Sequence, residues 1–334
     1  MRKTLLTKAL GLASAGLLAT TLLGGLAAQA ETRVLRLGHP EAPTHPHQVA
    51  AEKFKELVEA GSNGALTVEI YGQNQLGGQK EIVQGLRTGS LELGIASAGF
   101  LASNFPRTQL LDLPFLFSNP DVAAKLLDGE IGAALNADLE AAGIKGLGWG
   151  WGGYRNLETV STPVRTPADL AGLRIRIQDS PLFASMFKAA DAIPVPVAWA
   201  ETYTALQQGL IDGLEVPLVS IHANKMYEVT KYVSLTQHSY NSQPIMMSLQ
   251  VFQSLTPEQQ ALVLDAGQQA AQAMRDVVAE RETKTRDDLR AAGMEFVEVD
   301  LAAFQAVMAP VYEEFRPVVG DALLDLAIAA TKAN

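Results

Sequence analysis

Residues 34–71 read VLRLGHPEAPTHPHQVAAEKFKELVEAGSNGALTVEIY, and this stretch decides the fold class. It begins with alternating apolar and polar residues at 34–37 and ends with the same alternation at 66–71, which is typical of strands. Between them, residues 47–60 carry apolar side chains at helical spacing, and Gly61 marks the end of the helix. The stretch therefore predicts a strand, a helix and a second strand.

The same pattern continues along the chain. Residues 79–88 predict a helix and residues 91–96 a buried strand, which completes a β-α-β-α-β series. Such a series forms a largely parallel sheet with helices on both faces. A second series begins near Tyr154 and contains a strand at 173–177. Because 334 residues are about twice the length of one domain, we expect two α/β lobes.

One long helix is predicted late in the chain. Thr256 is a good N-cap, Pro257 suits the first helical position, and Gly293 ends the pattern. The segment 257–292 contains only one glycine, Gly267, and would be about 54 Å long at 1.5 Å per residue. This length exceeds the width of one lobe, so the helix is expected to span both lobes.

The N-terminus predicts export. Three basic residues precede a charge-free stretch at 9–28, and Ala28-Gln29-Ala30 fits a small-x-small cleavage site. The alternative is a permanent membrane anchor, but four glycines dilute the apolar stretch. We therefore interpret residues 1–30 as a cleaved signal peptide and expect a secreted or periplasmic mature protein.

The composition excludes several functional classes. Apolar residues make up 48% of the chain and charged residues 19%, which is typical of a globular protein with a sizeable core. The formal net charge is −10 and there is no long run of Lys or Arg, so we expect no nucleic-acid partner. The chain has no cysteine, which excludes thiol catalysis, disulfides, Cys-ligated zinc and a lipid-modified cysteine.

Two short motifs give only weak indications of catalysis or cofactor binding. Gly148-x-Gly150-x-x-Gly153 has dinucleotide-loop spacing, but extended chain and not a helix follows it, so a bent crossover between lobes is the better interpretation. Ser97 follows Gly94 by three residues, which misses the nucleophile-elbow spacing by one. No cofactor is predicted.

Three histidines and a carboxylate gather in residues 39–47. His39, His45 and His47 lie close to Glu41 and have the chemistry to bind a divalent metal. Three prolines interrupt the segment, however, and polar turns of this kind usually cap helices. We predict a capping loop and no metal site.

Arginines mark a candidate anion site. Arg174 and Arg176 alternate on one predicted strand, so they share a face, and Arg155 lies in the Gly-rich crossover before them. Aromatic residues are plentiful nearby, including Trp151 and Trp199. An arginine with aromatic walls suits an organic acid, but a structural ion pair explains the same residues, and the chemistry leaves both open.

Several short segments, in order, resemble one known family. They are VEIY at 68–71, QLG at 75–77, TGSLE at 88–92, LPF at 113–115, LAGLRIRI at 170–177, ALQQG at 205–209, IDG at 211–213 and YEV at 227–229. Each is weak alone, but their order and spacing resemble the solute-binding proteins of tripartite ATP-independent periplasmic (TRAP) transporters, of the DctP type. The similarity covers the chain from about Val34 to the C-terminal helix.

The resemblance implies a two-lobed periplasmic binding protein fold with an interlobe cleft. Lobe I would comprise residues 31–152 and about 242–281, and lobe II residues 153–241 and about 282–334. The lobes would close on a small carboxylate ligand, without catalysis or metal, and deliver it to a membrane permease driven by an ion gradient. We expect a monomer.

The resemblance also assigns site residues by position. Arg176 matches the arginine that pairs with the ligand carboxylate, and Arg155 matches a second binding arginine. The remaining matches are an aromatic contact at Trp199, first-lobe contacts at Ser97 and Phe100, and a polar pair at Asn241 and Gln243. Flanking contacts are expected from Trp151, His39, Glu41 and Glu215.

One departure from the family pattern bears on the ligand. This chain has Glu215-Val216-Pro217 where many members have Glu-Asn-Pro, and Val216 cannot make the hydrogen bond of the asparagine. With Tyr154 and Tyr240 also expected near the cleft, the sequence predicts a carboxylate with an apolar or aromatic body and disfavours a sugar acid.

Four alternatives stay open. A C4-dicarboxylate would use Arg155 for its second acid group, and a sulfonate would suit the same arginines. A ligand sensor that signals to a membrane receptor would use the same fold. An exported serine hydrolase would need a nucleophile–base pair, which no motif supplies.

Overall fold

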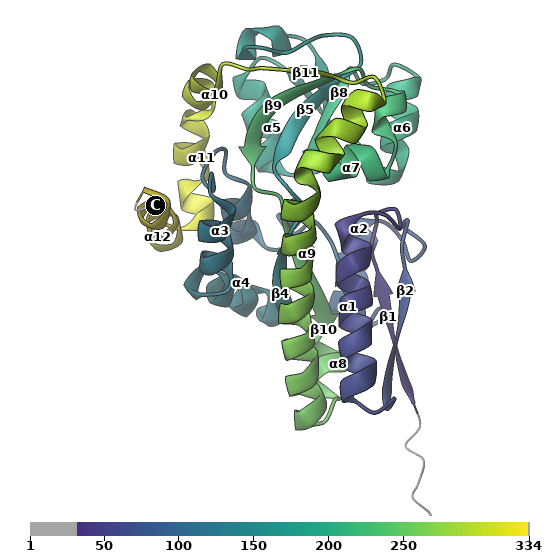
Figure 1. The fold of residues 1–334 in the computed structure, drawn as a ribbon. Coiled ribbons are helices and arrows are strands. Elements are labelled where there is room, and N and C mark those ends of the chain that lie inside the picture. The colour runs from purple at the N-terminus through teal and green to yellow at the C-terminus, as the bar shows by residue number, and fades with distance from the viewer. Residues whose placement is uncertain (1–31, 333–334) are drawn as a thin grey trace, which may run out of the picture. The chain divides into compact units, whose positions relative to one another are not determined.

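The computed structural model describes residues 32–332, so the predicted signal peptide lies outside the described residues. Two mixed sheets form the centres of two lobes (Figure 1). The first sheet has the order β2-β1-β3-β10-β4. Its strands are β1 Arg33–Gly38, β2 Leu66–Tyr71, β3 Leu93–Ile95, β4 Ile144–Trp151 and β10 Ser242–Ser248. β1 pairs in parallel with β2 and β3, whereas β10 is antiparallel to both its neighbours.

Helices cover both faces of the first sheet, as predicted. On β10, Ile245 and Met247 pack with the face that carries α1, whereas Met246 packs with Ile82 and Leu86 of α2. The alternation follows from the two-residue period of a strand. The helices of this lobe are α1 Pro46–Gly61, α2 Gln79–Thr88, α3 Pro120–Leu127, α4 Glu130–Ala141 and α8 Leu249–Gln253, with 3₁₀ turns η1 Ala98–Phe100 and η2 Pro106–Asp112. The predicted strand–helix–strand unit is therefore confirmed.

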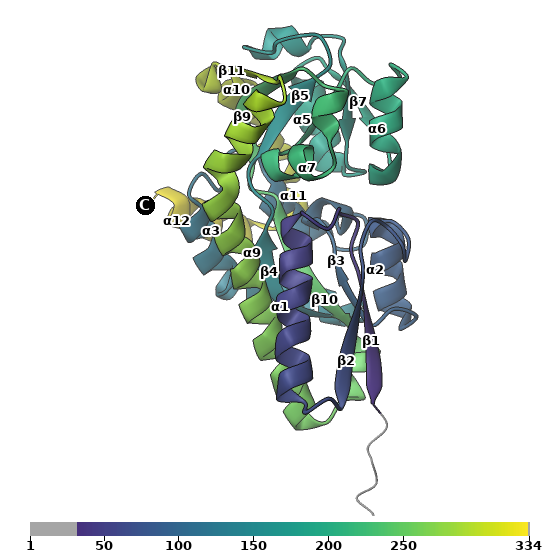
Figure 2. The same cartoon turned by 45° about the vertical axis from the view of Figure 1, so that its right-hand side comes forward.

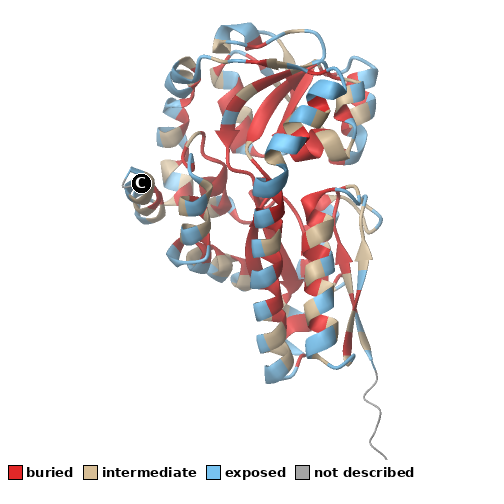
Figure 3. Cartoon of the chain, in the orientation of Figure 1, coloured by how far each residue is buried: buried red, intermediate tan, exposed pale blue. Residues whose placement is uncertain are grey.

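The second sheet has the order β11-β9-β5-β8-β6-β7. Its strands are β5 Arg155–Thr159, β6 Arg174–Ile177, β7 Ile193–Pro196, β8 Gly213–Pro217, β9 Tyr232–Ser239 and β11 Glu295–Val297. β6 is parallel to β7 and β8, and β5 is antiparallel to β8 and β9. Its helices are α5 Pro181–Ala189, α6 Trp199–Gln207 and α7 Leu218–Ala223, with 3₁₀ turns η3 Pro167–Leu170 and η4 Met226–Glu228. The strands of both sheets are largely buried, and the outer faces of the helices are exposed (Figure 3).

The long helix α9, Pro257–Ala291, runs without a break. Thr256 and Gln259 form a capping box at its start, and Gly267 does not interrupt it. α9 packs on α1 and β4 in the first lobe and reaches α7 in the second (Figures 1 and 2). The prediction that this helix spans both lobes is therefore confirmed.

The chain ends in three helices, α10 Leu301–Met308, α11 Pro310–Val319 and α12 Asp321–Lys332. Pro310 begins α11, whereas Pro317 lies inside that helix, and the break before α12 comes at Gly320, whose φ is +89°. α11 packs on α5 and η2, and α12 on α3, so this segment contacts both lobes. Within residues 32–332, no helix is both long and apolar enough to cross a membrane.

Candidate ligand-binding site

Residues from both lobes enclose a small buried chamber. It is lined by Glu41, Gln79, Ser97, Phe100, Arg155, Arg176, Gln178, Trp199, Val216, Pro217, Ser220, Asn241 and Gln243. The cavity has a volume of about 20 Å³, which is room for roughly one water molecule, so the lobes are closed on each other. Most of the predicted site residues therefore meet at one place, although they come from distant parts of the chain.

Arg176 presents an unpaired cation to this chamber. It lies in β6, is 1% exposed, and donates from Nε to the carbonyl of Val197 at 3.0 Å. Its Nη2 is buried without a partner, and no described carboxylate lies within ion-pair distance. The indole of Trp199 packs 5.4 Å from the guanidinium carbon. Burial, opposed in part by Glu215, lowers the pKa of Arg176 to about 10, so the group is charged and available to an anion.

Arg155 lines the same chamber, but its donors are occupied. Its guanidinium makes a bidentate ion pair with Glu215, and Nη2 also donates to the Glu215 carbonyl at 2.6 Å. Nη1 donates to Oδ1 of Asn241 at 2.8 Å. With its amide oxygen turned toward Arg155, Gln178 accepts from Nη1 at 2.7 Å. Burial lowers the pKa of Arg155, but Glu215 outweighs it and the pKa is raised.

Further buried acids surround this ion pair, and sequence reasoning missed them. Burial raises the pKa of Asp112 to about 7, and burial followed by the charge of Glu215 raises the pKa of Glu158 well above its usual range. Glu215 itself accepts from His238 at 3.2 Å, and although burial opposes ionisation, Arg155 holds the pKa of Glu215 below its usual range. The cluster therefore contains one ion pair, between Arg155 and Glu215, and two neighbouring acids whose raised pKa values favour the protonated form.

Glu41 enters the chamber from the loop after β1. Its Oε2 accepts from Nδ2 of Asn224 at 2.7 Å, which joins the first lobe to α7 of the second. Burial raises the pKa of Glu41 to about 7, although hydrogen bonds from Asn224 and Trp199 and the charge of Arg176 lower it.

The three histidines lie behind the chamber, and two of them, His45 and His47, orient groups that line it. His45 Nδ1 accepts from the backbone N–H of His47, so the neutral ring carries its proton on Nε2 and donates it to Ser220 Oγ at 3.1 Å. His47 Nε2 donates to Gln243 Oε1 at 2.9 Å, and His39 bonds Gln48. Burial lowers the pKa of all three, for His47 to about 3. Among residues 32–332, no group of His, Asp and Glu is arranged to hold a metal ion.

The chain also matches a known protein family. Residues 37–317 match the family model described as bacterial extracellular solute-binding protein, family 7, or DctP. The chain belongs to the DctP family.

Several proteins similar to this DctP member are named for the acids that they bind. It is 35% identical over 271 residues, 81% of this chain and 83% of its relative, to the 2,3-diketo-L-gulonate-binding periplasmic protein YiaO of Escherichia coli. It is 31% identical to the C4-dicarboxylate-binding periplasmic protein of Rhodobacter capsulatus, over 98% of this chain and 99% of that one. A TRAP solute-binding protein of Polaromonas sp. JS666, bound to D-erythronate, superposes with a TM-score of 0.87 at 31% identity, over 89% of this chain and 98% of that one. The resemblance to TRAP solute-binding proteins is confirmed.

Five residues that were expected in or near the cleft of this DctP protein do not line the chamber. Trp151 stacks on Tyr240 with ring centroids 5.5 Å apart, and Tyr154 packs edge-on against both, so these aromatics belong to the core. His39 lies behind the chamber, and Glu215 faces Arg155. The aromatic side chains that do line the chamber are Phe100 and Trp199.

The lining residues that sequence reasoning missed are Gln79, Gln178, Pro217 and Ser220. A glutamine or serine on a helix or loop carries no spacing signal, so no pattern pointed to them. Ser97 does line the chamber, but its Oγ donates to Oδ1 of Asn241 at 3.3 Å. The Gly-rich motif lies on and just after β4, where a methyl group at Gly148 would lie 2.5 Å from the carbonyl oxygen of Gly267 in α9. Close packing therefore explains this glycine.

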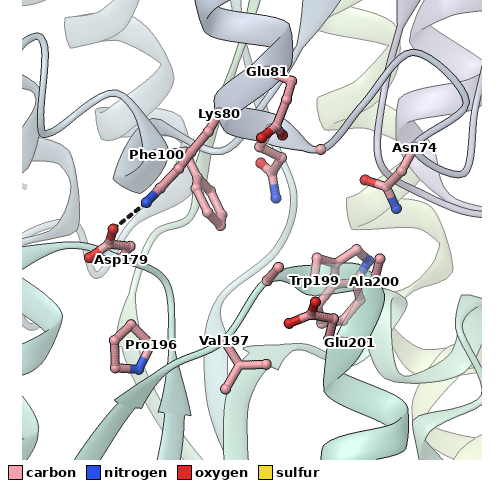
Figure 4. A pocket seen from close by; sticks show the side chains of 13 residues that line it. Asn74, Lys80, Glu81, Phe100, Asp179, Pro196, Val197, Trp199, Ala200 and Glu201 are labelled. Atoms are coloured by element: carbon pink, nitrogen blue, oxygen red, sulfur yellow. Dashed lines mark hydrogen bonds and ion pairs between the residues drawn. The ribbon is translucent and has the colours of Figure 1, made fainter.

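A larger cavity of about 360 Å³, here called the vestibule, adjoins the chamber. It shares Gln79, Phe100 and Trp199 with the chamber. Figure 4 shows Lys80 and Phe100 of the first lobe facing Asp179 and Trp199 of the second, and an ion pair joins Lys80 to Asp179 across the opening. The vestibule thus lies between the two lobes beside the chamber.

Proposed function

We propose that this chain is the ligand-binding component of a TRAP transporter and captures a small organic acid in the chamber between its lobes. The observation that carries this proposal is the buried guanidinium of Arg176, which has an unpartnered Nη2 and no ion pair among the described residues. A charged group held out of water without a counter-ion is costly. A ligand carboxylate would supply that counter-ion through charge-assisted hydrogen bonds.

The lining of the chamber favours a hydroxylated acid over the apolar acid that the sequence predicted. The aromatic wall inferred from Trp151, Tyr154 and Tyr240 is part of the core. The chamber instead carries amide and hydroxyl groups from Gln79, Ser97, Gln178, Ser220, Asn241 and Gln243. Some of these groups are already paired within the protein, but an apolar body would leave the remaining donors, such as the hydroxyl of Ser220 and the NH₂ group of Gln243, without partners, which costs binding free energy. Val216 removes one polar contact, which is a small loss compared with the six amide and hydroxyl side chains that line the chamber.

A C4-dicarboxylate is the second candidate, and the Rhodobacter relative favours it. Its second acid group would need Arg155, which already pairs with Glu215 and Asn241. A dicarboxylate would have to displace these partners, so we rank it below a monocarboxylate.

Membership of the DctP family supports the remaining parts of the proposal. The mature protein acts in the periplasm after cleavage near Ala30 and hands its ligand to a permease driven by an ion gradient. It binds without catalysis. Ser97 donates to an amide oxygen, and an amide cannot take a proton as a general base, so the serine hydrolase is disfavoured.

A thermal-shift screen of the mature chain tests the proposal. The panel contains D-erythronate, succinate, phenylpyruvate and taurine, with erythritol as the neutral counterpart of erythronate. A ligand at 100 times its Kd adds about 2.7 kcal/mol to the free energy of unfolding. We expect erythronate to raise the melting temperature most and erythritol to have no effect. Stabilisation by erythritol equal to that by erythronate would contradict a site built around a carboxylate.

A further inference from the structure

The chamber contains one carboxyl group that binding of an acid does not explain. Glu41 lines the same chamber as Arg176 and is 7% exposed. A negative charge beside the arginine that receives an anion repels that anion. Glu41 would therefore weaken binding unless it makes a favourable contact with another part of the ligand.

Glu41 can accept a hydrogen bond from a ligand in addition to those from its present partners. Asn224 donates to Oε2 at 2.7 Å and Trp199 supplies a further hydrogen bond, but neither neutralises the carboxyl group. Among the described residues Glu41 makes no ion pair, unlike Glu215, which pairs with Arg155. Burial raises the pKa of Glu41 to about 7. Since a carboxylate has about four acceptor sites, a ligand donor can still bind it.

Two other side chains that line the chamber, Ser220 and Gln243, are donors whose orientation His45 and His47 determine. Asn224 bonds both Glu41 and the Ser220 carbonyl, so Ser220 lies beside Glu41. His45 donates to Ser220 Oγ, which leaves the hydroxyl hydrogen of Ser220 for the chamber. His47 donates to Gln243 Oε1, which leaves the NH₂ group of Gln243 for the chamber. The chamber therefore offers an acceptor and two donors.

We propose that Glu41 accepts a hydrogen bond from a hydroxyl group near the ligand carboxylate, which makes the site specific for hydroxy acids. A hydroxyl donates to Glu41 and accepts from Ser220 or Gln243 at the same time. An oxo group accepts only, so it leaves Glu41 without a donor. An ammonium group donates only, so it leaves Ser220 and Gln243 without an acceptor. This inference rests on the proposed function, because it presupposes that Arg176 holds the carboxylate.

The test uses acids that share one carbon skeleton. Titration calorimetry at pH 8 compares butanoate with 2-hydroxy-, 3-hydroxy-, 2-oxo- and 2-aminobutanoate on the mature chain. The variant Glu41→Gln removes the acceptor charge and still offers an amide oxygen to Asn224. The matched control is Glu81→Gln, because Glu81 lines the vestibule and not the chamber. Thermal melting of each variant checks that the fold is retained.

We expect at least one hydroxybutanoate to bind about 10- to 100-fold more tightly than butanoate. Glu41→Gln should reduce this ratio to threefold or less, and Glu81→Gln should leave it unchanged. The inference is overturned if the hydroxy acids bind no better than butanoate, if the oxo or amino acid binds best, or if Glu41→Gln keeps the ratio. If no acid binds, butanoate included, the proposed function fails and this inference fails with it.

Discussion

Three arginines of the second lobe have the same side chain and different surroundings. Arg174 begins β6 at the surface and pairs with Asp212 at 2.6 Å. Arg155 is buried and pairs with Glu215. Arg176 is buried and has no carboxylate partner among the described residues. Pairing and burial together, and not the residue type, separate a surface ion pair, a structural ion pair and a ligand anchor.

The buried pair predicts a large stability effect at Glu215. Glu215→Ala leaves Arg155 charged and buried without its counter-ion, so the free energy of unfolding should fall by about 3–5 kcal/mol. Asp212→Ala is the matched control, because its partner Arg174 is partly exposed, and the loss there should stay below about 1 kcal/mol. Urea unfolding monitored by tryptophan fluorescence measures both. Equal losses for the two variants would show that burial of the pair is unimportant.

Asp112 predicts a pH dependence of stability. Its pKa is about 7 in the folded protein, where burial dominates and Arg155, Glu215 and Ser239 face it, against 3.8 for an ordinary aspartate. Between these values the folded state keeps a proton that the unfolded state has lost. The stabilisation is therefore complete below pH 3.8 and is lost as the pH rises through 7, by up to about 1.4 kcal/mol per pH unit.

Urea unfolding of the ligand-free protein at pH 5, 6 and 7 measures this slope. Asp112→Asn should make the slope more positive by about one proton than in the unmodified protein. The remaining slope has contributions of both signs, because Glu41 and Glu158 have raised pKa values and the four buried histidines, His39, His45, His47 and His238, have lowered ones. An unchanged slope in Asp112→Asn would assign the pH dependence to other groups.

At the level of elements, local sequence patterns predict much more of the fold than of the site. The helix at 79–88 and the strand at 66–71 have the predicted bounds, because their periodicity and end signals are local. β9 and β10 were not predicted. Every residue of β10 is buried, so no alternation of polar and apolar residues marks that strand. Among the site residues, Arg176 was accessible to sequence reasoning as an arginine in an apolar strand. Gln178 and Ser220 were not, because only the tertiary fold brings them to the chamber.

Because α9 packs closely on β4, we predict that one glycine-to-alanine substitution in this helix destabilises the protein. Glycine to alanine inside a helix normally stabilises by about 1 kcal/mol. At Gly267, however, the added methyl group would lie 2.4 Å from Cβ of Leu147. Gly267→Ala should therefore destabilise the protein by about 1–3 kcal/mol. The exposed neighbour Gln268→Ala is the control and should have little effect. A raised melting temperature for Gly267→Ala would mean that α9 does not pack tightly on β4.

At the scale of the whole molecule, closure depends on contacts that join the lobes. Glu41 bonds Asn224, His45 bonds Ser220, and Lys80 pairs with Asp179 across the vestibule. A ligand held by both lobes favours the closed state, because it makes its full set of contacts only there. The long helix α9 connects the lobes, and the chamber lies at their interface.

The pair across the vestibule predicts a change in ligand release. Asp179→Ala removes an exposed ion pair worth about 0–1 kcal/mol, so the release rate constant should rise by up to about fivefold while the association rate constant changes little. Stopped-flow tryptophan fluorescence measures both. Glu295→Ala is the control, since its exposed pair with Lys231 lies within the second lobe. The same release rate constant in both variants would argue against a contact that holds the lobes together.

The most direct test of the proposed function compares two arginines on one strand. Titration calorimetry with the acid selected by the thermal-shift screen would be carried out on the mature chain, Arg176→Ala and Arg174→Ala. Loss of one partner of a buried charge pair costs about 2–5 kcal/mol, so Arg176→Ala should weaken binding roughly 30- to several-thousand-fold. Arg174→Ala should stay within about twofold of the unmodified protein, because Arg174 pairs with Asp212 and does not line the chamber. Near-native affinity in Arg176→Ala would contradict the assignment of Arg176 as the group that binds the ligand carboxylate.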